Sequence, residues 1–467
     1  MGTQVASIIA FVLLSWFCPF QCRAAEWRDP SSHRVQFVTV EPGVNLEVLD
    51  WGGSGRALVL LPGYQSAHIF DDIAIKLSMF SHVYGITPRG IGASSHPESG
   101  YDAQHLAEDV LEVLSRLNID RPVLAGHSVG GQTMNVLGAQ HSSRLAGFVY
   151  LNSGEDATLG QEIWKRIKLD PAQVDAARAK LPAAMRDPPP PPIGKSFTDL
   201  QEWQKQAHGV AFPESELRQL YATNTDGTVG KYLLPRSLRD TVARNLQRPD
   251  YSGILVPSLA LMALPPRFED EIRRYEPVAD FEEEAMREVH DADLAIAREH
   301  IQELEEILNI QIVEMPGANS YIWLSNRKEV VQQMERFLTK ISSEELAEAK
   351  AAKEVEKGYG EEVFEIRDGI SPPRVKYQTE PEFPEGERRK HRQGQVTIRA
   401  IVGTDGRVHH PRVIRSMNPE FDRQALTTIN QWTFEPAIKD GRQVAVYITV
   451  DMMFRLYGNG AITNGPC

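Results

Sequence analysis

Cysteine is scarce in this chain of 467 residues, which contains only three. Cys18 and Cys22 lie in an N-terminal segment that we expect to be removed, which would leave Cys467 as the single thiol. One thiol excludes an internal disulfide, and three cysteines are too few for a cysteine-rich metal centre. The sequence predicts no cofactor and no metal site.

Basic residues are too few to balance the acidic ones. The chain has 50 Lys and Arg against 63 Asp and Glu, which gives a net charge of -13. This balance argues against a nucleic-acid partner, and no basic helix suited to a membrane surface is present. The chain therefore falls in the ordinary globular class.

Long apolar runs are absent except for one, Val5 to Phe20, which is shorter than the roughly 20 residues that span a bilayer. Small residues follow it at Ala24 and Ala25, so we interpret residues 1–24 as a secretory signal peptide. The mature protein would then be periplasmic or secreted and would have no membrane span. An uncleaved anchor is the alternative, because the segment before the run carries no Lys or Arg.

The length of the chain predicts two domains. Across residues 34–341, short β-like runs alternate with helical ones, which predicts an α/β domain with a doubly wound, mostly parallel sheet. The alternation is interrupted at 157–250, which we expect to be a helical cap. The expected strands are VQFVTV, NLEVLDW, ALVLLPG, HVYGITP, PVLAGHS, GFVYLNS, ILVPSLALMAL and IQIVEMPG.

A second, smaller domain is expected at 372–457, after a charged helical or flexible linker at 342–371 that is rich in Glu, Lys and Ala. It combines three β-like runs with one helical run, so we expect an α+β fold. Asp405-Gly406 between two of the β-like runs predicts a hairpin.

The segment VLAGHSVGG contains a G-x-S-x-G pattern centred on Ser128. Such a serine sits on a sharp turn between a strand and a helix. Its hydroxyl becomes a nucleophile only when a neighbouring base, usually a histidine held by a carboxylate, takes its proton.

Two upstream segments, LLPGYQSAH and TPRGIGASS, accompany this turn. Together the three segments resemble the α/β-hydrolase family, over about residues 34–341. The resemblance implies an α/β-hydrolase sheet with a helical cap, Ser128 as the catalytic nucleophile, and an oxyanion hole formed by the backbone N–H groups of Val129 and Tyr64. The upstream matches are Pro62, Gly63, Arg89, Gly90, Gly92 and Ser94, with Thr87 where the family has aspartate.

The same resemblance places Ser320 where the family has its catalytic histidine, because PGANSY stands where many bacterial members have PGANHY. His127 is expected to pack under the turn. His290 and His300, on an acidic helical stretch, are alternatives for the base with little support.

The position of the catalytic carboxylate is also open. Family members carry it after one of two strands, and the segment after Leu264 offers none. After the other strand, Asn152 stands where relatives often have aspartate. Asp156 or Glu155 is then the candidate acid, and a solvated loop carboxylate is the alternative.

Several short motifs occur across residues 372–457. They are PEFP (381–384), GQV (394–396), DGRV (405–408), WTFEPA (432–437) and the final strand VYITVDMMFRL. By these motifs the segment resembles the C-terminal domain of TonB, which implies a Gram-negative source and a protein partner in the cell envelope. The resemblance also implies binding of an extended segment by the addition of a strand to a sheet edge.

Two functional hypotheses follow. The first is a serine hydrolase that acts on a small ester or amide with an impaired triad. The second is a catalytically degenerate protein that binds a ligand or an envelope partner, with transport of the TonB type as one setting.

Overall fold

The computed structural model describes residues 27–456, except 182–185, 187–188, 276–282, 308, 360–361, 367–368 and 390–391. The predicted signal peptide and Cys467 lie outside the described residues. No described helix combines the length and the apolar character that a membrane span requires.

The N-terminal domain is built on an eight-stranded sheet of order β1-β2-β4-β3-β5-β6-β9-β10. β1 and β2 are antiparallel to their neighbours, and the other strands run parallel. The expected doubly wound sheet is thereby confirmed. The strands are β1 (Arg34–Glu41), β2 (Val44–Gly52), β3 (Ala57–Leu61), β4 (His82–Ile86), β5 (Val123–Gly126), β6 (Gly147–Leu151), β9 (Ser258–Leu264) and β10 (Ile310–Pro316).

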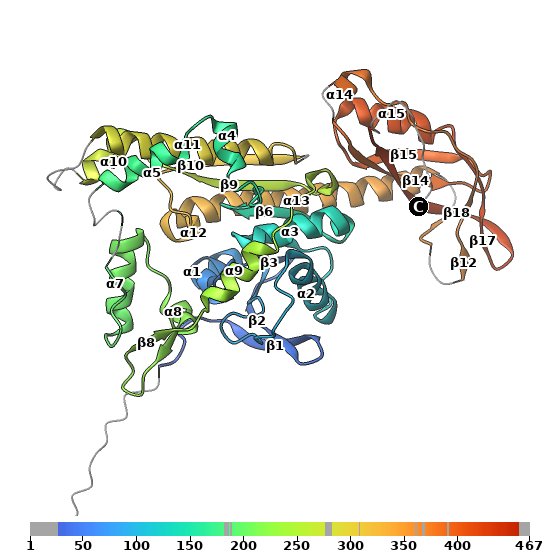
Figure 1. Cartoon of the computed structure of the whole chain (residues 1–467). Coiled ribbons are helices and arrows are strands. Elements are labelled where there is room, and N and C mark those ends of the chain that lie inside the picture. Colours follow the sequence, from blue (N-terminus) through green and yellow to red (C-terminus); the bar gives the residue numbers. More distant parts are fainter. Residues whose placement is uncertain are drawn as a thin grey trace, which may run out of the picture.

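Helices cover both faces of this sheet, so its central strands are apolar throughout (Figure 1). One face packs against α2 (Ala103–Arg116), α3 (Val129–His141) and α11 (Glu283–Leu304). The other packs against η1 (Ala67–Phe70), α1 (Asp71–Leu77), α12 (Ile322–Ser325) and α13 (Arg327–Tyr359). The acidic stretch forms α11, which buries Ile301 and Leu304 against the sheet.

The segment between β6 and β9 contains the expected cap. Part of it, around α7 and α8, has a small apolar core of its own, formed by Phe197, Leu200, Leu217 and Leu220 among others. α10 (Phe268–Tyr275) follows β9. The cap elements are α4 (Glu162–Ile167), α5 (Pro171–Lys180), α7 (Phe197–His208), α8 (Glu214–Leu220), β7 (Tyr221–Thr223), β8 (Val229–Tyr232) and α9 (Arg236–Arg244).

The C-terminal domain is a small sheet of order β12-β17-β18-β14-β15, with α15 packed on it through Phe421. The predicted hairpin joins β14 to β15 through the turn at Gly403 to Gly406. The elements are β11 (Val363–Phe364), β12 (Ile370–Ser371), β13 (Arg374–Tyr377), α14 (Glu385–Arg389), β14 (Gly394–Val402), β15 (Val408–Arg415), α15 (Pro419–Ile429), β16 (Thr433–Glu435), β17 (Ala437–Lys439) and β18 (Arg442–Phe454).

The predicted linker is mostly helical. α13 continues to Tyr359, because Glu, Lys and Ala are strong helix formers. The C-terminal sheet already begins at Val363, since β11 pairs in parallel with β18.

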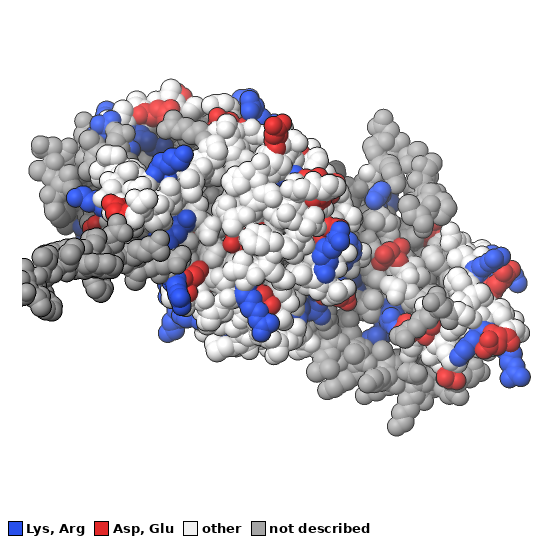
Figure 2. Space-filling view, turned by 90° about the horizontal axis from the view of Figure 1, so that it is seen from below, with Lys and Arg blue, Asp and Glu red and all other residues white. Residues whose placement is uncertain are grey.

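Acidic and basic side chains are interspersed on the face seen in Figure 2, so neither sign forms a continuous patch there.

Candidate functional site

Ser128 lies at the turn from β5 into α3 with φ 52° and ψ −119°, a conformation that few residues other than glycine adopt. The glycines of the motif permit this turn. A Cβ on Gly130 would lie 2.2 Å from the carbonyl oxygen of Leu61, and one on Gly126 would lie 2.5 Å from Met134 Sδ. The motif therefore brings the start of α3 against the end of β3.

The loop after β3 approaches the serine closely. A Cβ on Gly63 would lie 2.7 Å from Ser128 Cβ and 3.1 Å from its Oγ. Tyr64 follows in this loop and packs with Val129 in an apolar cluster that includes Leu238 of α9. The loop and the helix start that the resemblance assigned to the oxyanion hole thus lie beside Ser128, beneath the cap.

Ser320 and Asn152 meet at the ends of β10 and β6. Asn152 has a positive φ of 49°, and its Nδ2 donates a hydrogen bond of 3.2 Å to Ser320 Oγ. Its Oδ1 accepts one of 2.9 Å from the backbone N–H of Ala263. The two residues for which the resemblance predicts the family's acid and base positions are therefore in contact, and both carry neutral side chains.

His127 is the histidine that approaches this pair, with its Nε2 3.5 Å from Ser320 Oγ. It is buried between the rings of Tyr321 and Trp323, and its Nδ1 has no hydrogen-bond partner. Burial lowers the pKa of His127 to about 3. His127 therefore packs under the turn, as expected.

Asp156 and Glu155 make contacts other than with Ser320. Asp156 accepts hydrogen bonds from Thr158 and lies 3.5 Å from Arg248. Burial raises the pKa of Glu155 to about 7, and its Oε2 has no partner. In the described part of the chain, neither carboxylate pairs with Ser320.

The alternative bases on α11 are also placed away from the serine. His290 lies 2.9 Å from the carbonyl oxygen of Pro266 through Nε2 and 3.1 Å from Asp291 through Nδ1. Burial lowers the pKa of His300. Among the described residues, neither histidine has a hydrogen bond to Ser128.

Two polar residues around the site, Gln65 and Glu216, gave no signal of their own in the sequence. Gln65 Nε2 donates a hydrogen bond of 2.8 Å to the hydroxyl of Tyr321, next to Ser320. Glu216 of α8 is fully buried and accepts hydrogen bonds from the Ser66 backbone N–H, at 3.1 Å, and from its hydroxyl. These contacts join residues that are far apart in the chain, so no local motif marks them.

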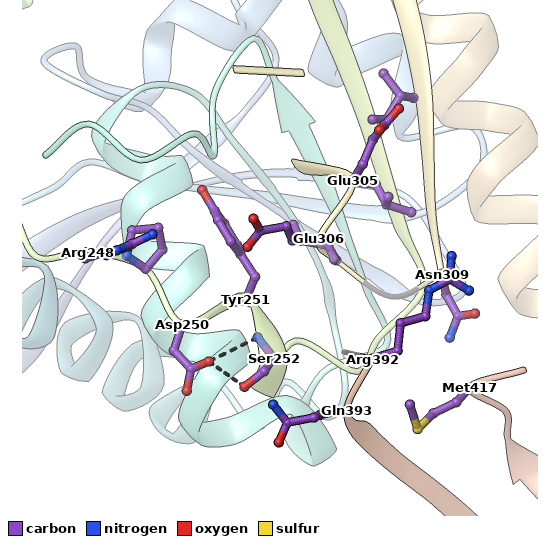
Figure 3. Close-up of a pocket in the computed structure, with 14 residues that line it drawn as sticks. Arg248, Asp250, Tyr251, Ser252, Glu305, Glu306, Asn309, Arg392, Gln393 and Met417 are labelled. Atoms are coloured by element: carbon purple, nitrogen blue, oxygen red, sulfur yellow. Dashed lines mark hydrogen bonds between the residues drawn. The ribbon is translucent and has the colours of Figure 1, made fainter. Parts of the chain in front are cut away.

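The groove in Figure 3 lies elsewhere, between the two domains, and has a volume of about 890 Å³. Tyr251 and Glu306 line it from the N-terminal domain, and Arg392 and Met417 from the C-terminal one. Beside it, Asn309 Nδ2 donates a hydrogen bond of 2.9 Å to the carbonyl oxygen of Ser416. None of the site residues expected from the sequence lines this groove.

A mostly parallel eight-stranded sheet with a serine on a strained turn after its fifth strand in chain order defines a class of proteins with an α/β-hydrolase architecture. Residues 58–333 match the model of the "Alpha/beta hydrolase family", and residues 379–456 match "Gram-negative bacterial TonB protein C-terminal". The chain belongs to the α/β-hydrolase family and carries a TonB C-terminal domain.

Curated relatives match only part of the chain. A putative non-heme haloperoxidase of Mycobacterium phage D29 is 34% identical over 143 residues, which is 29% of this chain and 49% of that protein. N-formylmaleamate deformylase of Pseudomonas putida is 34% identical over 92 residues, 19% of this chain and 34% of that protein. The chain thus spans half or less of the length of these relatives.

The solved structure of E-2-(acetamidomethylene)succinate hydrolase is similar to this one over a region that covers 66% of this chain and 99% of the hydrolase chain. The identity is 17% and the TM-score is 0.46. The assignment of the fold rests on the strand order and the family match.

Proposed function

We propose that the N-terminal domain binds a small ester or amide beside Ser128, and that its serine lacks an effective base, so that hydrolysis is residual. The observation that supports this is the contact between Asn152 and Ser320. A hydroxyl at the end of β10 is a poor proton acceptor near neutral pH. An amide that donates Nδ2 to that hydroxyl supplies no negative charge.

The expected loss is large. Removing the serine or the histidine of such a triad lowers turnover by roughly 10⁶-fold, and the remaining acceleration over water is roughly 10³- to 10⁴-fold. Residual turnover of that size would come from the oxyanion hole and from binding alone.

A second candidate is a working hydrolase in which His127 acts through the hydroxyl of Ser320. The 3.5 Å approach of His127 Nε2 to Ser320 Oγ favours it. The depressed pKa of His127 opposes it, because a base with a pKa of about 3 has little tendency to take the proton of a serine. His127→Phe would abolish hydrolysis under this second candidate only.

The test is to restore the missing groups. In the double variant Asn152→Asp, Ser320→His, the new carboxylate and imidazole would take the places of the amide and the hydroxyl. We expect the double variant to hydrolyse a small acetyl ester at least about 100-fold faster than the wild-type chain. It should also react with a fluorophosphonate probe at Ser128.

Ser128→Ala in the same background is the control and should abolish both signals. If the wild-type chain already reacts at Ser128 and turns over many times, the proposal of an inactive serine is wrong.

The TonB C-terminal domain indicates a protein of the Gram-negative cell envelope. We further propose that the mature chain is periplasmic and that residues 372–457 bind an envelope protein. Osmotic-shock fractionation of a native host would test the location, and recovery of the chain in the cytoplasmic fraction would contradict it. Photocrosslinking from the exposed side chain of Tyr377 would test the contact.

A further inference from the structure

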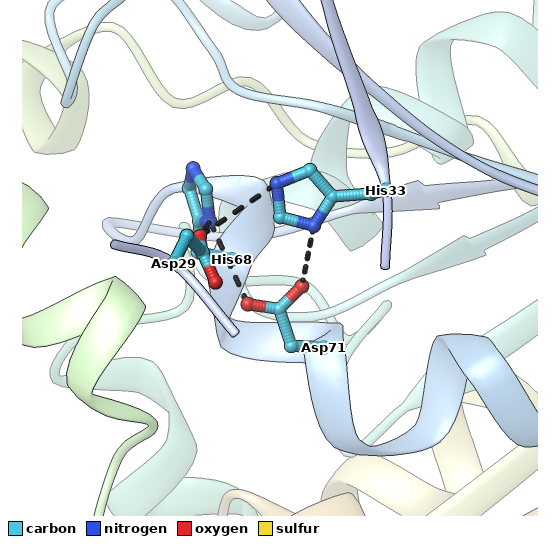
Figure 4. A group of neighbouring side chains, drawn as sticks. All are labelled: Asp29, His33, His68 and Asp71. Carbon is cyan, nitrogen blue, oxygen red and sulfur yellow. Dashed lines mark hydrogen bonds and ion pairs between the residues drawn. The ribbon is translucent and has the colours of Figure 1, made fainter. Parts of the chain in front are cut away.

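We propose that Asp29, His33, His68 and Asp71 form a binding site for a divalent metal ion, with zinc as the ion that suits them best. Each residue offers one ligand atom, and these four atoms lie within 4.8 Å of one another. Figure 4 shows the side chains converging from the segment before β1 and from the segment where η1 meets α1.

The spacing of the groups is close to that of a tetrahedral site. His68 Nδ1 lies 3.3 Å from Asp29 Oδ2 and 3.5 Å from Asp71 Oδ2, and His33 Nδ1 lies 3.1 Å from Asp71 Oδ1. Ligand atoms of tetrahedral zinc, bound at its usual distances, lie about 3.3–3.5 Å apart. Small side-chain movements would therefore complete the site.

His68 supplies an independent indication. It is only 4% exposed, and its Nδ1, which faces Asp29 and Asp71, forms no hydrogen bond with any described residue. Its other nitrogen, Nε2, lies 3.5 Å from Glu47 Oε1. A carboxylate that holds the N–H of one ring nitrogen leaves the lone pair of the other for a metal, which is the usual arrangement around zinc-bound histidine.

Asp71 is held in place in a similar way. Trp51 Nε1 donates a hydrogen bond of 3.1 Å to Oδ1, and Ser215 Oγ donates one of 2.6 Å to Oδ2. Each oxygen keeps room for a further partner, because a carboxylate oxygen has two lone pairs. The surrounding hydrogen bonds therefore fix the direction of this ligand before any ion arrives.

The charges of the cluster also favour the binding of a cation. Within the described residues, the charged partners of Asp29, Asp71 and Glu47 are histidines, and no Lys or Arg pairs with them.

Two imidazoles and two carboxylates favour zinc over calcium or magnesium, which prefer oxygen ligands alone. Four protein ligands leave no open position, so the ion would be structural. It would tie the segment before β1 to η1. Through the hydrogen bond from Ser215 to Asp71, it would also tie both to α8 of the cap.

The experiment uses the full mature chain, stripped with a chelator, dialysed and titrated with zinc chloride alone. We expect about one zinc ion per chain, and thermal stability that rises with zinc concentration. Binding should release a proton, which calorimetry in two buffers of different ionisation enthalpy would measure.

His68→Ala should lose this zinc, whereas the matched control His105→Ala should keep it, because His105 is exposed at the start of α2 and pairs there with Asp102. Glu47→Gln leaves all four ligands and should weaken zinc binding about 10- to 100-fold, so it keeps the test valid if His68→Ala does not fold. A stripped wild-type chain that takes up no zinc, or a Glu47→Gln variant with unchanged zinc affinity, would overturn the proposal.

Discussion

Glu216 is a fully buried carboxyl group at the junction of cap and sheet. Burial raises its pKa from 4.5 to about 8, although the hydrogen bonds from Ser66 act in the opposite direction. The folded chain therefore holds a proton that the unfolded chain releases between these two values. Between pH 4.5 and pH 8 the contribution of Glu216 to the free energy of unfolding falls as the pH rises.

We expect Glu216→Gln to remove this fall. The difference in the free energy of unfolding between the variant and wild type should shift in favour of the variant as the pH rises from 5 to 8, by at most about 5 kcal/mol. Urea unfolding at both pH values measures the difference. Glu214→Gln, on the same helix but paired with Arg218 and partly exposed, is the control and should show no such trend.

Gly130 is the residue at which the motif meets the end of β3. Its absent side chain leaves room for the carbonyl oxygen of Leu61, which would lie 2.2 Å from an added Cβ. Gly130→Ala should therefore destabilise the N-terminal domain by about 3 kcal/mol or more, as measured by urea unfolding. Gly386→Ala, whose Cβ would meet only the flexible end of Glu420, should stay within about 0.5 kcal/mol of wild type.

At the scale of elements, α8 joins the cap to the sheet through two adjacent polar residues. Ser215 is buried and donates its hydrogen bond to Asp71, and Glu216 receives those of Ser66. Apolar packing alone would let this short helix slide, whereas these bonds fix its position.

Ser215→Ala leaves one buried carboxylate oxygen without this donor, which should cost about 1–3 kcal/mol. Limited proteolysis should then cleave the cap faster than in wild type. Ser252→Ala removes a hydrogen bond that stays within its own surface turn with Asp250, and it serves as the control. Equal rates for the two variants would contradict the role given to Ser215.

At the scale of the whole molecule, the described apolar clusters divide into two groups. The clusters on the two faces of the large sheet contain no residue beyond Ile341, and those of the small sheet contain none before Val363. The two domains therefore have separate cores joined by α13. We expect them to unfold in separate transitions.

Phe421→Ala tests this independence, because Phe421 is fully buried between α15 and the small sheet. It should lower the free energy of unfolding of the C-terminal domain by about 3–5 kcal/mol and leave the unfolding of the N-terminal domain unchanged. Fluorescence and calorimetry would follow both transitions. One transition that moves as a unit would show that the domains are coupled.

The sequence predicted most of the fold because its signals are local. Strands such as β5 and β6 are short apolar runs, and the G-x-S-x-G motif specifies its own turn through glycine. The sequence left open whether the segment after residue 341 is helical or flexible, because a helix rich in Glu, Lys and Ala has the composition of a linker, and the structure contains the helix.

By itself, the sequence determined the family and the turn that carries Ser128, since both depend on local residue identity. That Ser320 stands in place of a catalytic histidine stays a prediction. Only the tertiary structure decided what surrounds them. The contact of Asn152 with Ser320, the burial of Glu216 and the convergence of Asp29 with His68 join segments that are distant in the chain. No local pattern encodes such contacts, because they form only when the loops at the ends of the strands come together.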